Sequence, residues 1–217
     1  NSLVADLGHS NVVRSGSASM TLERLAHLEV VVTALRVALT EGQMESRANA
    51  ALVLWRTRQP FEVQHLAESM RSGTETTRLA ICGLLGQMRS REGIPLLKLA
   101  LDNTIPTVRA AAVYALRSTA HVADLKPVAK HPKGFDLLAL RNTTPITEST
   151  QKTQLAAIGI LKTALHHSDA NIREKACDAL GRAGARETLG AMERLTSDED
   201  PGVRIAATTA ISVLNES

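Results

Sequence analysis

The stretch Leu101-Asp102-Asn103-Thr104-Ile105-Pro106-Thr107-Val108-Arg109-Ala110-Ala111-Ala112-Val113-Tyr114-Ala115-Leu116 decides the fold, because related stretches recur along the chain. In each copy an arginine is followed by small and apolar residues, and neighbouring arginines lie 31 residues apart. One gap is 64 residues long and leaves room for two units with a small insertion. A fixed period of this kind is typical of repeat proteins. The repeat arginines are Arg47, Arg78, Arg109, Arg173 and Arg204.

Each repeat unit contains two apolar segments, which indicates a pair of helices. Residues 94–101 form such a segment before Arg109, and residues 161–165 form one before Arg173. Pro106 and Pro201 stand three residues before a repeat arginine, at the first turn of a second helix, where a missing N–H costs nothing. Aromatic residues make up only 2% of the chain, so Leu, Ile, Val and Ala must fill the core. We therefore expect an all-α fold, an α-solenoid of about six antiparallel helix pairs.

The repeat resembles that of the HEAT-repeat superfamily, in particular the bacterial branch with units of the form (L)xD(x)xPxVRxxAxxAL, which includes phycobilisome-lyase-type repeats. The best matches are residues 101–116 and 200–211, and the resemblance extends over roughly residues 20–217. It implies that the second helices line the concave face of the solenoid. It also implies a structural ladder, in which the repeat arginines pair with acidic residues of neighbouring turns, such as Asp102, Asp169 or Asp198.

Two segments depart from the regular pattern. Residues 1–19 are rich in Ser, Gly and Asn, which predicts an irregular N-terminal lead-in. Arg141 stands in register for a fourth unit, but Pro145 would break a second helix there. We expect a degenerate fourth repeat, with short helices near residues 121–130 and 135–141 and a loop near 142–150. The rest of residues 20–217 is expected to form a single HEAT-like repeat domain.

Helical geometry assigns one face of each second helix to the core and the opposite face to binding. At about 100° per residue, the positions one, five and eight after the repeat arginine point away from the core. An apolar stripe on such an outward face indicates that another surface covers it. We expect it to bind a peptide or a helix of another protein, unless Trp55 packs on a neighbouring unit or the lead-in covers the stripe. The predicted partner-binding residues are Leu52, Trp55, Leu79, Tyr114 and Arg117.

No recognisable catalytic or metal-binding set accompanies the repeat. None of the seven histidines belongs to a chelating motif, and there is no GxSxG, GxGxxG or P-loop motif. Cys82 and Cys177 lie three units apart, where each serves best as a small apolar residue. We therefore expect a non-enzymatic scaffold or adaptor without a catalytic residue, a metal or a cofactor.

Two other functions stay open as alternatives. An enzyme subunit of the bilin-lyase type is built of the same repeats and needs an apolar cleft with a few polar groups. A HEAT-like DNA-binding or repair protein would need a basic concave surface to bind phosphates. Of the positions assigned to that surface, only Arg117 is basic, so we expect no nucleic acid partner.

The remaining expectations concern location and assembly. The net charge of +3 is spread over the chain, and no targeting signal or membrane-length apolar run is visible. We expect a cytoplasmic protein without a membrane partner. The chain opens on Asn1 instead of Met, which raises the expectation that it belongs to a longer protein. The sequence leaves the oligomeric state open.

Overall fold

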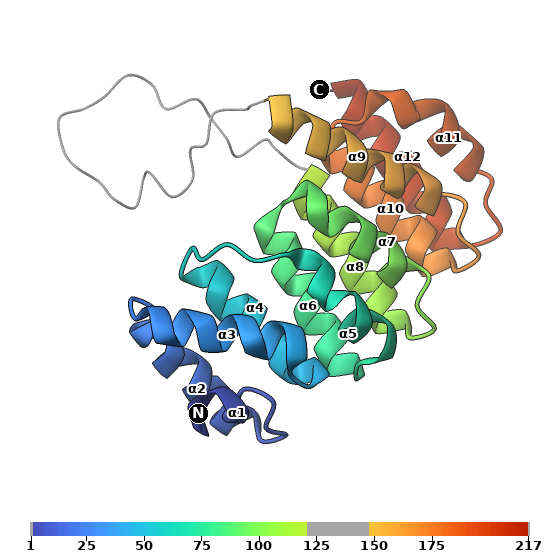
Figure 1. Ribbon diagram of the computed structural model, residues 1–217. Helices are drawn as coiled ribbons and strands as arrows, with labels where there is room; N and C mark the ends of the chain where they lie inside the picture. The colour runs from blue at the N-terminus through green and yellow to red at the C-terminus, as the bar shows by residue number, and fades with distance from the viewer. Residues whose placement is uncertain (1, 121–147, 217) are drawn as a thin grey trace. The chain divides into compact units, whose positions relative to one another are not determined.

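The computed structural model describes residues 2–120 and 148–216 (Figure 1). These residues form twelve α-helices and no strand, so the all-α prediction is confirmed. The chain folds into two compact units. The N-terminal unit holds Asn1–Met88 and Pro95–Ala111, and the C-terminal unit holds Arg89–Ile94 and Ala112–Ser217. One continuous domain over residues 20–217 stays a prediction.

Helical hairpins make up both units, and the unit boundary passes through α8. The helices are α1 (Ser2–Asp6), α2 (Val12–Leu25), α3 (Glu29–Glu41), α4 (Met44–Arg56), α5 (Ala67–Ser72), α6 (Glu75–Met88), α7 (Ile94–Leu101), α8 (Pro106–Ala120), α9 (Glu148–Ala164), α10 (Ala170–Arg182), α11 (Leu189–Leu195) and α12 (Pro201–Glu216). The short first helices α5, α7 and α11 each follow a 3-10 turn, over Val63–Leu66, Arg91–Gly93 and Arg186–Thr188. Twelve helices in sequential pairs agree with an α-solenoid fold class.

The predicted core positions of the second helices are buried. On α8 and α10 the apolar side chains at these positions are at most 5% exposed, with Ala111 half-buried as the exception. The buried ones are Val108, Ala112, Ala115, Leu116, Ile172, Ala176, Ala179 and Leu180. The helical period therefore gives the correct inward face on both α8 and α10.

The expected starts of the second helices are also confirmed. Pro106 and Pro201 are the first residues of α8 and α12, where the ring of proline already has helical φ. Asp169 caps α10 by accepting the N–H of Asn171. Asp200 caps α12 in the same way. These carboxylates satisfy N–H groups that have no partner inside a helix.

The prediction of an irregular lead-in over residues 1–19 is wrong, because α1 and most of α2 lie there. Asn11 starts α2 by accepting the N–H groups of Val13 and Arg14. Leu7 and Ala18 are buried, at 0% and 2% exposure. The Ser, Gly and Asn content suggested a loop, but Asn11 is a helix cap and the small residues lie within α2.

The degenerate fourth unit lies almost wholly outside the described residues. This applies to the expected helices near 121–130 and 135–141 and to residues 142–147 of the expected loop. The last three residues of that loop, 148–150, already belong to α9. There the loop prediction is wrong by one helical turn.

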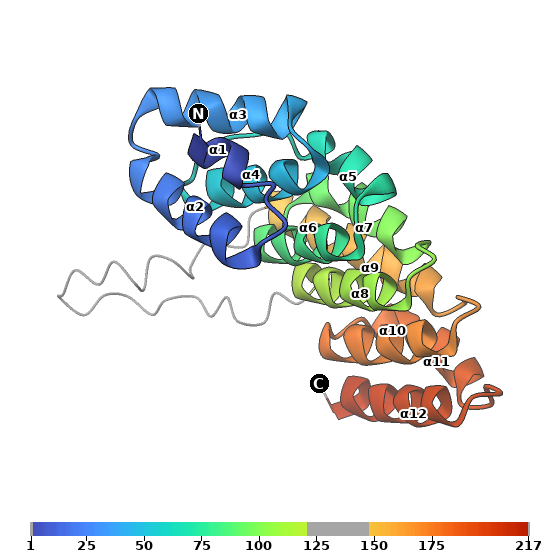
Figure 2. The ribbon, with the colours of Figure 1, turned by 90° about the horizontal axis from the view of Figure 1, so that it is seen from below.

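In the C-terminal unit, α10 and α12 pack side by side (Figure 2). The two helices approach closely at Gly181, where an added Cβ would lie 3.0 Å from Cβ and 3.1 Å from Cα of Ala210. Gly181 stands eight residues after Arg173, a position that the helical count had assigned to the outward face. It is buried instead, because the eighth position reaches the flank of the helix where the next second helix packs.

Candidate functional site

The five predicted partner-binding residues divide between the two units. Leu52, Trp55 and Leu79 lie in the N-terminal unit and are half-buried. Tyr114 and Arg117 lie in the C-terminal unit, and Tyr114 is 51% exposed.

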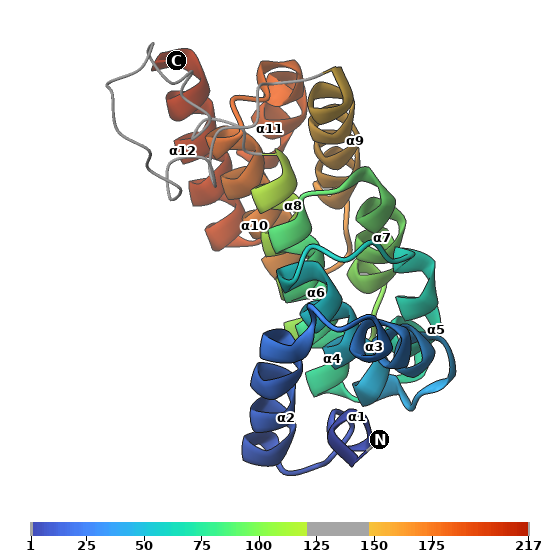
Figure 3. The same ribbon diagram turned by 60° about the vertical axis from the view of Figure 1, so that its left-hand side comes forward.

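Helix α2 packs against α4 and reduces the exposure of the predicted face there (Figure 3). Ala48, one residue after Arg47, is only 5% exposed. An ion pair of 2.9 Å between Arg56 and Glu23 joins the ends of the two helices. Helix α2, whose first residues belong to the predicted lead-in, therefore packs on α4 within the N-terminal unit.

Tyr114 is the most exposed of the predicted residues, and two cations lie near its ring. The guanidinium carbon of Arg117 lies 5.1 Å from the ring centre, and Nζ of Lys175 lies 5.6 Å from it. Both distances are within the range of cation–π attraction. Because Lys175 belongs to α10, the ring also links α8 to α10 within the C-terminal unit.

A carboxylate on α10 holds two arginines beside this ring. Arg117 Nη1 lies 3.0 Å from Oδ2 of Asp178, and Arg182 Nε lies 2.7 Å from its Oδ1. The hydrogen bond to Asp178 raises the pKa of Arg182 above its ordinary value. Both guanidinium groups therefore bind the same carboxylate, that of Asp178.

A hollow of about 300 Å³ opens next to this cluster. Arg89, Arg117, Ser118 and Arg182 line it. Arg89 follows α6 in the left-handed backbone region, with φ 48°, a conformation common just after a helix end. We call Tyr114, Lys175, Asp178 and the four residues that line the hollow the Tyr114 surface.

The sequence undercounted the positive charge of this surface. Counting positions one, five and eight after each repeat arginine gave Arg117 as the single basic residue. Arg182 and Arg89 stand nine and eleven residues after Arg173 and Arg78, and Lys175 stands two after Arg173. Long basic side chains reach well beyond the face on which their Cα lies, so a wider window at the helix ends would have included them.

The repeat arginines bind the turn that precedes their own helix. Arg109 Nη1 donates to the carbonyl oxygens of Asn103 and Thr104, at 2.9 and 3.0 Å. Arg204 donates in the same way to Asp198 and Glu199. Arg47 and Arg78 each reach one such carbonyl, of Gly42 and Arg71. This bonding secures the turn before each second helix, an arrangement that the sequence reasoning did not include.

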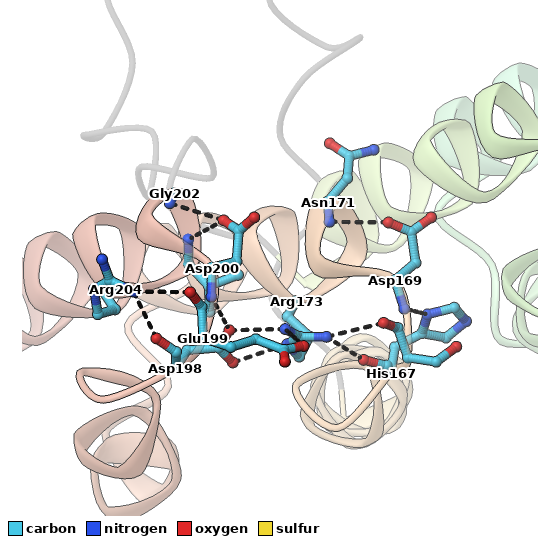
Figure 4. Close-up of polar contacts among 11 residues, drawn as sticks. His167, Asp169, Asn171, Arg173, Asp198, Glu199, Asp200, Gly202 and Arg204 are labelled. Atoms are coloured by element: carbon cyan, nitrogen blue, oxygen red, sulfur yellow. Dashed lines mark hydrogen bonds and ion pairs between the residues drawn. The ribbon is translucent and has the colours of Figure 1, made fainter.

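Arg173 pairs with a carboxylate of a neighbouring turn, that of Asp198 (Figure 4). Arg173 Nε and Nη2 lie 2.9 and 2.7 Å from the two carboxylate oxygens of Asp198. Its Nη1 also donates to the carbonyls of His167 and Ser168. The bidentate hydrogen bond to Arg173 holds the pKa of Asp198 below its usual value.

The two other acidic residues that the resemblance offered have different roles. Arg78 donates to Oδ1 of Asn103 at 3.3 Å and not to the neighbouring Asp102. Asp169 caps α10. The side chain that receives the arginine, Asn103 or Asp198, stands six residues before the next repeat arginine in both cases. Each also accepts the N–H two residues further on, so the side chain that shapes the turn is the one that receives the arginine.

The described residues offer no group of three or more His, Cys, Asp or Glu side chains that would hold a metal ion. Both cysteines are buried. Burial raises the pKa of each thiol, of Cys82 and of Cys177, to about 12. A thiol with so high a pKa is a poor nucleophile. Within residues 2–120 and 148–216 there is also no helix long and apolar enough to cross a membrane.

Comparison with known proteins identifies the repeat. Residues 158–217 match the family model described as HEAT repeats. Residues 158–217 are HEAT repeats. These HEAT repeats take in the C-terminal part of α9 and all of α10 to α12, and they include the Arg173–Asp198 pair. No curated protein has a significant sequence match to the chain.

Solved structures resemble this chain in fold at low sequence identity. An engineered protein is 16% identical with a TM-score of 0.50, over 99% of this chain and 96% of its own. A designed armadillo repeat protein in complex with the peptide (KR)4 is 15% identical with a TM-score of 0.49, over 99% of this chain and 98% of its own. At these identities the likeness concerns the fold alone.

Proposed function

We propose that this protein is a non-enzymatic interaction scaffold that binds a peptide or helix of another protein along the outward face of its second helices. The observation that carries the proposal is the half-exposed ring of Tyr114 on α8, on the side away from the buried face of that helix. A tyrosine ring offers a large, rigid contact area and is a frequent anchor of protein interfaces.

The surroundings of Tyr114 support a binding role over a purely structural one. Arg117 is about one third exposed and Asp178 less than half, so their side chains hold a fixed position yet remain accessible. An aromatic anchor within a rim of ordered charges matches the usual anatomy of a protein interface. The buried thiols offer no reactive group for an enzyme, which favours the scaffold over a lyase.

In the N-terminal unit the same proposal rests on Leu52, Trp55 and Leu79. They are half-buried, so a partner would contact only part of each side chain. We assign the main anchor to Tyr114, because its ring is the most exposed. The partner belongs to the class of extended or helical segments, and no nucleic acid, membrane or cofactor takes part.

The test is a selection of random peptides displayed on phage, using the whole chain as bait. Peptides selected on the wild type are then titrated by fluorescence anisotropy against Tyr114→Ala and a control, Leu155→Ala. Leu155 is 57% exposed and lies on α9 in the same unit. Removing an interface anchor costs about 2 kcal/mol, which is roughly thirtyfold in Kd.

We expect Tyr114→Ala to weaken binding by at least tenfold and Leu155→Ala by less than twofold. Circular dichroism should show the same helical content in both variants. Equal losses in the two variants, or no enrichment of any peptide on the wild type, would refute the proposed function.

A further inference from the structure

Among residues 2–120 and 148–216, the Tyr114 surface holds the cations Arg89, Arg117, Lys175 and Arg182 and the carboxylate of Asp178. Three guanidinium groups line the hollow, those of Arg89, Arg117 and Arg182. Asp178 is the carboxylate bonded to Arg117 and Arg182. Among the described residues, no hydrogen bond or ion pair involves the side chain of Arg89. With Lys175 at the ring of Tyr114, the excess of cations faces solvent next to an exposed aromatic ring.

We propose that this hollow receives acidic side chains, and that the segment bound by the C-terminal unit is therefore an acidic peptide, with Asp or Glu next to the residue that covers Tyr114. The proposal deepens the proposed function and rests on it. It names the chemistry of the partner, which an apolar anchor alone leaves open.

The contacts of Asp178 show that the hollow suits a carboxylate. Its two oxygens already lie 3.0 and 2.7 Å from guanidinium nitrogens of Arg117 and Arg182. A guanidinium group has five N–H donors in a planar fork that matches the carboxylate group. Arg182 is 62% exposed, so a carboxylate arriving from solvent reaches it without displacing the core. Arg89 adds a third guanidinium on the same hollow.

The nearest other acidic residue of α10 points elsewhere. Glu174 carries its carboxylate toward the start of α12, where Oε2 lies 3.0 Å from the position of a Cβ added at Gly202. Its charge is therefore directed at the first turn of α12, and Asp178 remains the carboxylate that faces the arginines. Opposite charge on the partner then gains both attraction and orientation.

The experiment measures anisotropy of fluorescein-labelled oligoglutamate and oligolysine peptides of equal length against the whole chain at low salt. The variants are Arg89→Gln and Arg182→Gln, with Arg194→Gln as the control. Arg194 is an exposed arginine on α11 of the same unit, away from the hollow. All three changes remove one positive charge, so any difference between them reflects position and not net charge.

We expect oligoglutamate to bind and oligolysine not to bind. Each hollow variant should weaken oligoglutamate binding about three- to tenfold, as expected for a lost charge-assisted hydrogen bond. The control should change it less than twofold. Raising the salt concentration should weaken wild-type binding more steeply than that of the hollow variants.

Four results would overturn the proposal. One is the same loss with Arg194→Gln as with Arg89→Gln, and another is tighter binding of oligolysine. The third is tighter binding of a single-stranded oligonucleotide of equal charge, which would assign the hollow to phosphates. Peptides that depend on Tyr114 but carry no acidic residue would also overturn it while leaving the proposed function intact. Failure to select any Tyr114-dependent peptide would instead remove the proposed function.

Discussion

Replacing Arg173 by alanine should destabilise the protein more than replacing Arg204 by alanine. Arg173 loses two bonds to backbone carbonyls and both bonds to the carboxylate of Asp198. Arg204 loses only its two bonds to carbonyls. The comparison of Arg173→Ala with Arg204→Ala therefore isolates the effect of the carboxylate pair.

The structure gives the size of the difference. The side chains of Arg173 and Asp198 are only 9% and 8% exposed, so Arg173→Ala leaves a nearly buried carboxylate without its cation. Removing one partner of a buried pair costs about 3–5 kcal/mol. Losing two hydrogen bonds at a partly exposed turn costs about 1–2 kcal/mol. We expect Arg173→Ala to lower the free energy of unfolding by about 2 kcal/mol more than Arg204→Ala does.

Urea unfolding followed by circular dichroism measures both free energies. A double-mutant cycle with Asp198→Ala should give a coupling energy of about 1–3 kcal/mol between Arg173 and Asp198. Equal destabilisation by Arg173→Ala and Arg204→Ala, together with a coupling energy near zero, would show that the carboxylate pair does not stabilise the fold.

The same pair predicts an acid dependence of stability. The pKa of Asp198 is lowered in the folded protein by its hydrogen bond from Arg173. Its contribution is therefore fully present above the unfolded-state pKa, about 4 for an aspartate, and is lost as the pH falls through the lower folded-state pKa. In Arg173→Ala the loss of stability on acidification below about pH 4 should be smaller than in the wild type.

Two further predictions concern packing and thiol chemistry. Gly181→Ala should destabilise the protein by about 1–3 kcal/mol, because the new Cβ would lie 3.0 Å from Ala210. Gly159→Ala on α9 places a Cβ with nothing within 4 Å and should stabilise the protein by about 0.5–1 kcal/mol. Stabilisation by both changes in thermal unfolding would contradict the close approach of α10 and α12. Cys82 and Cys177 should resist alkylation by iodoacetamide at pH 8 in the folded protein, because burial raises each thiol pKa to about 12; rapid labelling detected by mass spectrometry would show that the thiols are not buried.

The fold was predictable from the sequence because the deciding signals are local and repeated. The 31-residue period and the two prolines are visible in the sequence itself. The burial of positions such as Leu116 then follows from helical geometry. The lead-in was predicted wrongly because its composition resembles a loop. The spacing of Ala18, Leu22 and Ala26, at i and i+4, carried the helical signal.

The candidate site was predictable only in part. The outward direction of Tyr114 follows from its place five residues after Arg109. The packing of α2 on α4 and the ion pair of Arg117 with Asp178 do not follow from it. They depend on contacts between residues far apart in the sequence, a separation of 33 positions for Glu23 and Arg56 and of 61 positions for Arg117 and Asp178. A count of faces on isolated helices contains no such contacts. The same limit explains why Gly181 was assigned outward although α12 packs against it.

Photo-crosslinking tests the central claim most directly, because it reports which side chain touches the bound segment. Tyr114→p-benzoylphenylalanine and Leu155→p-benzoylphenylalanine place the same photoreactive group at two positions that are 51% and 57% exposed in one unit. With a selected peptide bound, irradiation should give a crosslinked product at position 114 and none at position 155. Crosslinking at position 155 alone, or equally at both, would contradict binding along the outward face of the second helices.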